Sequence, residues 1–441
     1  MSGEANWDML VVGGTVLTME PDTEPIKNGA VAVADGRIAA VGPAEELLEV
    51  GQPGDVLNAG NCLVLPGLVN THSHLAMTLL RGIADDLPLM QWLEGHIWPA
   101  EKEHINRETV RLGTELAAAE QLLGGITTTT DMYFFADEVS EVLAAAGMRA
   151  VVAESLIGFA TPRCATSEEM LAKQRDLLEA YEDHPLITPS VAAHAPYSVQ
   201  AADLVAETEL AEGYEVPMQI HLSETAWEVE KLLEEKGLSP VAYLADLGVL
   251  SERTVAAHCV HVSPQDIELL AEFEAGVSHN PVSNLKLASG VSPVPALLDG
   301  GVKLGLGTDG AASNNTLDLL RDMQLAALLH KGVSGDPTVL PARQMLEVVT
   351  VNGARVLGLD KRIGTLVEGH DADLICLSID GPHTAPMYDP FSHVVFAARA
   401  SDVRHVLVRG KILVRNRELK TLDRERIEAQ VREFSETVRP S

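Results

Sequence analysis

The N-terminal part of the chain alternates apolar and polar residues in the segments DMLVVGGTVLTME and GAVAVADGRIAAVG. This period of two, interrupted by Gly-Gly and Asp-Gly pairs, is typical of small antiparallel hairpins. The segments DADLICLSI and VRHVLVRGKILVRN repeat the pattern near the C-terminus. Because neither end is large enough to bury a good core by itself, we predict that both termini join in one small β-sandwich.

Between the two ends, short β-rich runs alternate with long helical stretches such as RETVRLGTELAAAEQLLGG. We count eight such runs, which are CLVLPGLVNTHSH, ITTTTDM, RAVVAESLI, LITPSVAAHAPY, VPMQIHLSE, TVAAHCVHV, AGVSHNP and VKLGLGTDG. Eight β–α repeats within roughly 300 residues have the size and pattern of a TIM barrel. A doubly wound open sheet is the alternative, but it usually has fewer strands.

Nearly every run ends in a residue that is able to bind a metal or move a proton. These residues are His72, His74, Asp131, Glu154, His194, His221, Glu224, His258, His279 and Asp309. A barrel gathers the C-terminal ends of its strands at one rim, where barrel active sites form, whereas an open sheet spreads them along a line. We therefore predict an α/β fold in which residues 67–364 form a (β/α)8 TIM barrel. Residues 1–66 and 365–441 would form the β-sandwich.

The overall composition narrows the possible partners. The chain has 441 residues, of which 46% are hydrophobic and only 4% aromatic, so the core must be mainly aliphatic. It carries 32 basic and 64 acidic residues, which gives a net charge of −32. An acidic excess of this size argues against nucleic acid and anionic membranes as partners.

The cysteines and the N-terminus indicate a cytoplasmic protein. Cys62, Cys164, Cys259 and Cys376 are scattered without a CxxC pair, which suits a reducing compartment and offers no thiolate metal site. The start MSGEANWDML has neither the basic nor the apolar region of a signal peptide. No apolar stretch approaches the roughly 20 residues that span a bilayer.

The segment LPGLVNTHSHLAMTLLRG contains two histidines, His72 and His74, separated by one residue. In a strand both imidazoles would point to the same side and share a divalent ion. A lone HxH pair is weak evidence, because satisfied or exposed histidines are common. His221 in QIHLSE and Asp309 in GTDG strengthen the interpretation, since they end two further runs. Three nitrogens and one carboxylate, with room for a water molecule, indicate a catalytic metal site.

Five segments in this order resemble the amidohydrolase superfamily and its mononuclear-metal deaminase branch: PGLVNTHSH, IHLSE, AAHCVH, HNPVSNLKLASG and GTDGAASNN. The segment NTHSHLAMTLLRGIADDLPLMQWLEGHIWPAE is similar to the 5′-methylthioadenosine/S-adenosylhomocysteine deaminases. The resemblance covers nearly the whole chain. It implies that His72, His74, His221 and Asp309 bind one Zn²⁺ per subunit, although another divalent transition metal would also suit these ligands.

The resemblance also implies the catalytic roles. Asp309 would accept a proton from the attacking water and deliver it to the departing amine. Glu224 would protonate the ring nitrogen of the substrate, which suits a carboxyl group whose pKa is raised by burial. Both carboxylates would touch the substrate, and a solvated loop glutamate is the alternative interpretation of Glu224. His258 would hydrogen-bond the attacking hydroxide, whereas His261 on the same run would face elsewhere.

Further residues resemble the substrate contacts of nucleoside deaminases. Glu101 would accept hydrogen bonds from ribose hydroxyls, and His194 would lie near the sugar and the purine. Trp92 and Trp98 would either wall the purine or pack in the core. Arg163 would either pair with a homocysteine carboxylate or be an ordinary surface arginine, and its surroundings favour the second.

The sequence therefore predicts a zinc-dependent hydrolytic deaminase that converts the 6-amino group of S-adenosylhomocysteine, 5′-methylthioadenosine or adenosine to the 6-oxo group. Guanine, pterin and s-triazine rings are the alternative substrates within the superfamily. A dinuclear hydrolase is disfavoured because LITPSVAAHAPY lacks a bridging lysine, and a dinucleotide site at GLGTDG because Asp309 would face a pyrophosphate. A non-catalytic scaffold would usually have lost a ligand. The expected partner is a small nucleoside, and the resemblance implies a homo-oligomer.

Overall fold

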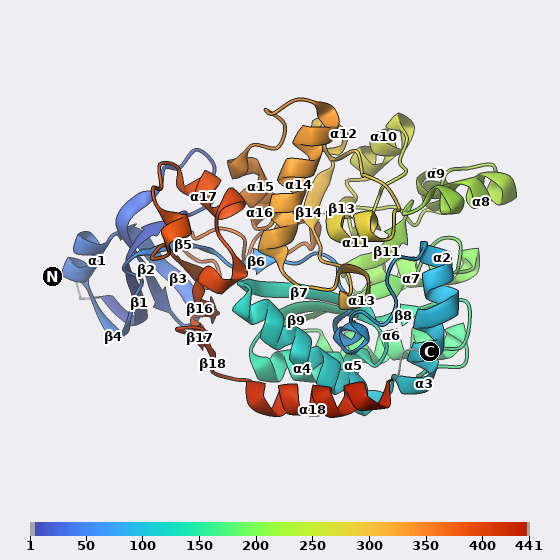
Figure 1. Ribbon diagram of the computed structural model, residues 1–441, viewed down its shortest axis with the longest axis horizontal. Helices are drawn as coiled ribbons and strands as arrows, with labels where there is room; N and C mark the ends of the chain where they lie inside the picture. Colours follow the sequence, from blue (N-terminus) through green and yellow to red (C-terminus); the bar gives the residue numbers. More distant parts are fainter. Residues whose placement is uncertain (1–4, 439–441) are drawn as a thin grey trace.

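The computed structural model describes residues 5–438 and contains two sheets (Figure 1). One sheet combines strands from both ends of the chain, drawn in blue and red, and lies at one end of the molecule. The other sheet is formed by the middle of the chain and is surrounded by helices.

The terminal sheet has the strand order β18-β17-β16-β15-β5-β1-β2-β3, and β4 pairs with β1. The strands are β1 Ala5–Val16, β2 Ile26–Ala34, β3 Arg37–Pro43, β4 Gly51–Asn58, β5 Cys62–Pro66, β15 Leu374–Ser378, β16 Val403–Val408, β17 Lys411–Arg415 and β18 Glu418–Leu419. Val11 and Val31 from the N-terminal part and Leu374 and Leu407 from the C-terminal part belong to the same buried cluster. The prediction that both termini join in one small β-sandwich is confirmed in that strands from both ends combine, and they form a single continuous sheet.

One predicted hairpin is wrong. Gly13–Gly14 does not reverse the chain, because β1 continues through this pair with shifts in its register against β2. A Cβ atom on Gly14 would lie 2.8 Å from the Val64 side chain, so this irregular position needs a glycine. The predicted hairpin at Asp35–Gly36 is confirmed, since β2 pairs with β3 in antiparallel orientation. Strands β16 and β17, from the segment near the C-terminus that repeats the pattern, also pair in antiparallel orientation.

The second sheet is parallel and has the order β6-β7-β8-β10-β11-β12-β13-β14, with β9 beside β8. Its strands are β6 Leu68–Val69, β7 Ile126–Tyr133, β8 Arg149–Leu156, β9 Ile187–Pro189, β10 Val191–Ala193, β11 Met218–Leu222, β12 Thr254–His258, β13 Gly276–His279 and β14 Lys303–Leu306. A parallel bridge between Asn70 and Leu306 connects the first strand segment to the last. The eight predicted runs contain these strands, except that β7 continues one residue past its run to Tyr133, and the predicted (β/α)8 barrel is confirmed.

Helices cover the outside of the barrel. They are η1 Leu75–Leu80, α2 Leu89–Trp92, η2 Leu93–Ile97, α3 Trp98–His104, α4 Arg107–Leu123, α5 Ala136–Ala146, α6 Ser167–Tyr181, α7 Ala201–Gly213, α8 Ala226–Lys236, α9 Pro240–Asp246, α10 Pro264–Glu272, α11 Pro281–Lys286, α12 Val294–Asp299, α13 Ala311–Asn314, α14 Leu319–Ser334, α15 Ala342–Val348 and α16 Val351–Val356. Outside the barrel lie α1 Ala44–Val50, η3 Pro382–Thr384, α17 Pro390–Phe396, η4 Ala400–Asp402 and α18 Arg424–Thr437. Within residues 5–438, no helix combines the length and the apolar character needed to cross a membrane.

Helix α4 supports the segment that follows the paired histidines. Asn106 caps this helix, because its side chain accepts hydrogen bonds from the backbone nitrogens of Glu108 and Thr109. A Cβ atom on Gly113 would lie 2.6 Å from the carbonyl oxygen of Ala76, so glycine allows η1 to pack directly on α4. Since η1 begins immediately after His74, this packing helps to fix the position of the histidine pair.

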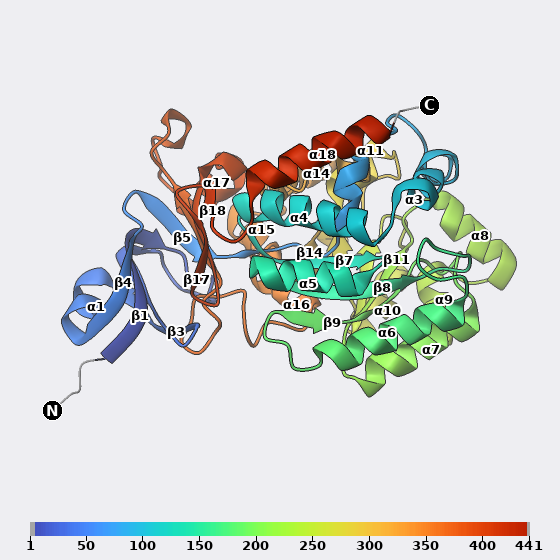
Figure 2. The ribbon, with the colours of Figure 1, turned by 90° about the horizontal axis from the view of Figure 1, so that it is seen from below.

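The C-terminal helix α18 lies along α4, as Figure 2 shows. Arg426 forms an ion pair with Glu115 of α4 at 2.9 Å, and Ile427 is buried. The last helix therefore contacts the barrel, although it follows the strands of the terminal sheet. The boundaries after residues 66 and 364 stay predictions.

A buried ionic cluster joins the barrel to the terminal sheet. Arg149 begins β8 and is only 1% exposed, and its guanidinium donates to Asp373 at 2.7 Å and to Asp371 at 2.8 Å. Both carboxylates immediately precede β15. Because an unpaired buried charge is costly, this cluster fixes the two parts of the molecule to one another at the end of the barrel opposite the site.

Candidate active site

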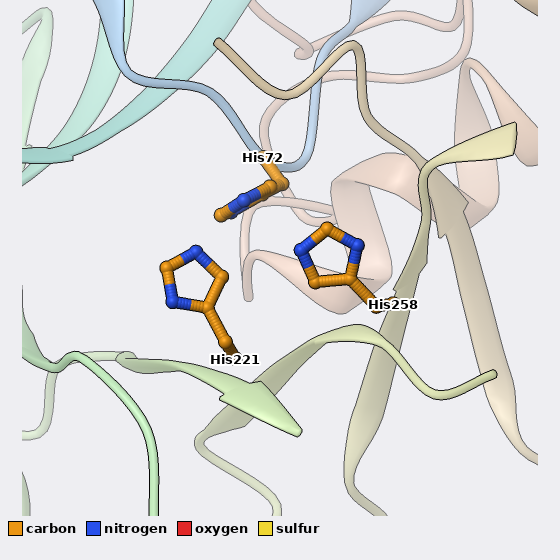
Figure 3. Close-up of side chains that lie close together, drawn as sticks. All are labelled: His72, His221 and His258. Carbon is orange, nitrogen blue, oxygen red and sulfur yellow. The ribbon is translucent and has the colours of Figure 1, made fainter. Parts of the chain in front are cut away.

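Three histidines from different parts of the barrel face one another at its rim (Figure 3). His72 follows β6, His221 belongs to β11 and His258 ends β12. The ring centroid of His72 lies 5.0 Å from that of His221 and 5.4 Å from that of His258. All three side chains are buried, so their nitrogens are available to one another or to a shared ion.

His74 and Asp309 lie beside these rings. The Nε2 atom of His74 is 3.2 Å from Nε2 of His221, and Oδ1 of Asp309 is 3.4 Å from Nε2 of both His72 and His74. Among the described residues, Nε2 of His72 has no hydrogen-bond partner although it is buried. The four predicted ligands thus direct nitrogen and oxygen lone pairs into one small space, which fits a divalent ion.

The backbone around the histidine pair differs from the prediction. His72 and His74 lie in a loop after the two-residue strand β6, not in an extended strand. The buried Asp131 at the end of β7 accepts a hydrogen bond of 2.6 Å from the backbone nitrogen of Leu75. Burial raises the pKa of Asp131 to about 8. Asp131 therefore holds this loop in place and does not join the cluster of predicted ligands.

Backbone carbonyls orient two of the imidazoles. Nδ1 of His74 lies 2.7 Å from the carbonyl oxygen of Met132, and Nδ1 of His221 lies 2.7 Å from that of His194. A carbonyl only accepts, so each Nδ1 carries a proton and each Nε2 has a free lone pair. Burial and the neighbouring His72 lower the pKa of His74 to about 4 and that of His221 well below its ordinary value. Both rings are neutral, as metal ligands must be.

His258 has the opposite proton arrangement. The side-chain amide nitrogen of Asn284 lies 2.8 Å from Nδ1 of His258. An amide NH₂ group only donates, so Nδ1 of His258 accepts and Nε2 carries the proton. Burial lowers the pKa of His258 to about 3, which keeps the ring neutral. His258 is therefore prepared to donate a hydrogen bond into the site.

Asp309 is held by three donors. Ser283 and Ser313 donate to its Oδ2 at 2.6 and 2.8 Å, and the backbone nitrogen of Gly310 donates to Oδ1 at 2.7 Å. Burial raises the pKa of Asp309, but the nearby imidazoles of His72, His74 and His258 outweigh burial and hold the pKa well below its ordinary value. Asp309 is consequently an anion.

Glu224 is a buried acid opposite these ligands. Burial, followed by the charges of Asp309 and Glu228, raises the pKa of Glu224 well above its ordinary value. Glu228 receives hydrogen bonds of 2.9 Å from the backbone nitrogens of Ser223 and Glu224 and thereby fixes the loop after β11. Oε2 of Glu224 lies 3.8 Å from Nε2 of His258. Glu224 is 7% exposed, so it is not a solvated loop residue.

A cavity opens onto this cluster. Glu101 and His194 line it, as predicted for substrate contacts. Tyr133 donates a hydrogen bond of 2.6 Å to Glu101, and burial raises the pKa of Glu101 to about 7. Nδ1 of His194 lies 2.7 Å from Oγ of Ser198.

Both candidate tryptophans also line the cavity. Trp92 is 4% exposed and donates a hydrogen bond of 3.2 Å to the carbonyl oxygen of Ala84, so most of its ring packs in the core. Trp98 packs edge-on against Phe159 with ring centroids 4.8 Å apart. Trp98 and Phe159 therefore form an aromatic wall of the cavity, of which the sequence analysis identified only Trp98.

Several polar residues singled out in the sequence have other partners. Arg163 is ion-paired with Asp137 at 2.6 Å and with Glu154 at 2.9 Å, and it does not line the cavity. His261 bonds a backbone carbonyl oxygen, and Nε2 of His279 lies 3.1 Å from another buried histidine, outside the cavity.

Sequence reasoning missed the residues that orient the site. They are Tyr133, Glu228, Ser283, Asn284 and Ser313, each of which hydrogen-bonds Glu101, the loop of Glu224, His258 or Asp309. Ser283, Asn284 and Ser313 lie within the motifs HNPVSNLKLASG and GTDGAASNN. Polar side chains on the turns after β13 and β14 were thus an available signal, whereas nothing in the sequence marked Glu228 or Tyr133.

The sequence matches the Amidohydrolase family over residues 63–413. The chain belongs to the amidohydrolase family. A second, short match covers residues 29–49 and corresponds to an imidazolonepropionase-like composite domain of bacteria. This amidohydrolase is 47% identical over 438 residues to a protein of Syntrophobacter fumaroxidans named 5-methylthioadenosine/S-adenosylhomocysteine deaminase, covering 99% of this chain and 100% of that relative.

Solved structures agree with the family. A crystal structure of an adenosine deaminase from Xanthomonas campestris with bound zinc matches this amidohydrolase with a TM-score of 0.97 at 39% identity, covering 98% of this chain and 99% of that one. Atrazine chlorohydrolase TrzN from Arthrobacter aurescens, complexed with zinc, gives a TM-score of 0.90 at 25% identity, covering 97% and 99%. The amidohydrolase fold is therefore shared over nearly the entire length of the chain.

Proposed function

We propose that this amidohydrolase is a metal-dependent deaminase of adenosine-type nucleosides. It would add water to C6 of the purine and release the 6-amino group as ammonia, which leaves the 6-oxo product. S-Adenosylhomocysteine, 5′-methylthioadenosine and adenosine are the proposed substrates. The names of the relatives in Syntrophobacter fumaroxidans and Xanthomonas campestris support this reaction, as does the chemistry of the residues around the cavity.

His72, His74, His221 and Asp309 would hold the ion, and one Zn²⁺ per subunit is the proposed occupant. Support for a metal comes from the neutral imidazoles and from the unpartnered, buried Nε2 of His72. Support for zinc comes from the three-nitrogen, one-carboxylate donor set and from the zinc in the Xanthomonas campestris relative. A divalent ion of this kind lowers the pKa of a water molecule toward neutrality and so supplies the nucleophile.

The protein's own residues would carry the protons. Asp309, an anion, would accept a proton from the attacking water and later pass it to the departing amine. Glu224, whose pKa is raised by burial, would donate a proton to N1 of the purine and make C6 more electrophilic. His258 would donate a hydrogen bond from Nε2 to the attacking oxygen.

Glu101 and His194 would bind the nucleoside. Glu101 would accept hydrogen bonds from the ribose hydroxyls, for which its carboxylate must exchange or share the bond from Tyr133. His194 would contact the sugar and the purine, together with Glu224 and Asp309. We also propose a catalytic barrel at residues 67–364, a β unit at residues 1–66 and 365–441, assembly as a homo-oligomer and a cytoplasmic location.

One observation carries the proposal: the buried Glu224, whose pKa is raised, lines the same cavity as His74, His221 and Asp309, and its Oε2 lies 3.8 Å from Nε2 of His258. The test is ammonia release by the zinc-replete protein from each of the three nucleosides, with guanine as the control. We expect ammonia from the nucleosides and none from guanine. If all three nucleosides stay unchanged, or if guanine is the better substrate, the proposed function is wrong.

A further inference from the structure

Away from the ligands, the cavity wall is mainly apolar. It includes Leu89, Leu93, Ile97, Trp98, Ile157 and Phe159. The rings of Trp98 and Phe159 meet at an interplanar angle of 65°. Phe159 is 42% exposed although it lines the cavity, so this aromatic pair reaches from the interior to the solvent.

The aromatic pair lies next to the proposed ribose contact. Trp98 and Glu101 are three residues apart on α3, a spacing that places two side chains on the same face of a helix. If Glu101 binds the ribose hydroxyls, the 5′ carbon of the same sugar lies within reach of Trp98 and Phe159. The group attached to that carbon would then contact two aromatic rings.

This part of the cavity offers no partner for a negative charge. Among the described residues that line the cavity, none is a lysine or an arginine. The nearest arginine along the chain after Phe159 is Arg163, whose Nη1 donates to Asp137 at 2.6 Å and to Glu154 at 2.9 Å. Two carboxylates therefore already neutralise that guanidinium.

We propose that Trp98 and Phe159 bind an uncharged 5′-alkylthio group, so that 5′-methylthioadenosine is a better substrate than S-adenosylhomocysteine. This inference rests on the proposed deaminase function. A thioether sulfur contacts aromatic rings favourably, whereas a homocysteine group brings a carboxylate and an ammonium ion. Removing a carboxylate from water without a cationic partner is costly.

The first test compares kcat/KM for four nucleosides on the zinc-replete protein: 5′-methylthioadenosine, 5′-butylthioadenosine, S-adenosylhomocysteine and adenosine. The butylthio chain has a length close to that of homocysteine but carries no charge. We expect both alkylthio nucleosides to exceed S-adenosylhomocysteine by about tenfold or more. A smaller difference, or the reverse order, would overturn the inference alone. If none of the four is deaminated, the proposed function itself fails.

A variant of Phe159 tests its proposed role. The measured quantity is the ratio of kcat/KM for 5′-methylthioadenosine to kcat/KM for S-adenosylhomocysteine. This ratio does not depend on the fraction of folded protein. Phe159→Arg should lower this ratio by about tenfold, because the new guanidinium can pair with the homocysteine carboxylate. Val333→Arg, which adds the same guanidinium at an exposed position outside the cavity, is the matched control and should keep the ratio within about threefold of the original. An unchanged ratio in Phe159→Arg would contradict the assignment of Phe159.

The variant Arg163→Gln tests whether Arg163 binds the homocysteine carboxylate. Because Arg163 is occupied by Asp137 and Glu154, the substitution should lower the stability of the protein but leave the ratio unchanged. A loss confined to S-adenosylhomocysteine would show that Arg163 binds its carboxylate, and the inference would be overturned.

Discussion

The side-chain amide nitrogen of Asn284 lies 2.8 Å from Nδ1 of His258, and both side chains are buried. Through this contact, the proton of the neutral imidazole is placed on Nε2, which faces Glu224. His74 and His221 have the reverse arrangement, because their Nδ1 atoms donate to backbone carbonyls. Hydrogen bonds behind the rings therefore give one imidazole a protonated Nε2 and two imidazoles an Nε2 with a free lone pair, within a group of similar side chains.

We expect Asn284→Asp to lower kcat by about 100-fold, the usual cost of losing one donor to the reacting oxygen. The carboxylate would accept a hydrogen bond from Nδ1–H of His258, so that the single proton of the neutral imidazole would move from Nε2 to Nδ1. The measurement is kcat together with metal content by elemental analysis, and the metal content should not change. Asn284→Ala removes the amide without imposing the opposite tautomer and should cost less. Equal kcat values for Asn284→Asp and the original protein would contradict this role.

Glu224→Gln tests the proposed acid. The amide has the same shape but cannot give a proton to N1, so kcat should fall by about 10²- to 10⁴-fold. Because burial holds the pKa of Glu224 well above its ordinary value, the active protonated form is lost only as the pH rises through that pKa. The pH profile of the original protein should therefore show an alkaline decline that the residual activity of Glu224→Gln lacks. The same decline in both proteins would assign it to another group.

Much of the site was predictable because barrel topology brings strand ends together. His221, Glu224, His258 and Asp309 needed only the assignment of their runs to successive strands. His72 and His74 lie together at the rim as predicted, but the assumed strand is wrong. Both histidines lie in a loop after β6. The two histidines still reach the rim, because a hydrogen bond from the backbone nitrogen of Leu75 to Asp131 fixes the loop to β7.

Proton positions and supporting contacts were not predictable. Asn284 of α11 contacts His258 at the end of β12, 26 residues earlier, and spacing along the chain carries no information on that contact. Glu228 looks like an ordinary residue on the polar side of α8 until its bonds to the loop before the helix are seen. The turn expected at Gly13–Gly14 failed because a glycine pair serves a bulge as well as it serves a hairpin.

Loss of one ligand should remove the metal. We expect His74→Ala to lower zinc affinity by more than about tenfold and to abolish the rise in Tm that added zinc gives the original protein. His261→Ala is the matched control, because Nε2 of His261 bonds the carbonyl oxygen of Ser289 at 2.6 Å and lies outside the ligand group. Elemental analysis and thermal unfolding with and without a chelator would measure both effects. A stoichiometric ion in His74→Ala would contradict the assignment.

Arg149→Met should destabilise the protein by about 3–5 kcal/mol, because it leaves Asp373 and Asp371 buried with fewer cationic partners. The control is Arg362→Met. Arg362 also pairs with Asp371, at 3.0 Å, but its side chain is 41% exposed and solvent screens the interaction. Its loss should cost less than about 1 kcal/mol. Denaturant unfolding of the original protein and both variants would measure their free energies of unfolding. Similar decreases in both variants would show that the burial of Arg149 does not determine how much its ion pairs stabilise the protein.

Glu207 gives a pH-dependent prediction far from the reaction. It is completely buried on α7, where Nε2 of Gln174 from α6 donates to its Oε1. Burial raises the pKa of Glu207 to about 8. The folded state therefore binds this proton more tightly than the unfolded state, and stability declines as the pH rises from the unfolded pKa, about 4.3, to about 8.

Glu207→Gln keeps an acceptor for Gln174 and removes the titration. Relative to the original protein, we expect this variant to gain at least about 1.4 kcal/mol in unfolding free energy between pH 5 and pH 9, the equivalent of one unit of pKa. Glu209→Gln, at an exposed position of the same helix, is the matched control and should give no such gain. Unfolding curves at the two pH values would measure both. A constant difference between Glu207→Gln and the original protein would mean that the folded state does not hold this proton, and that the carboxylate finds a partner or water inside the helix pair.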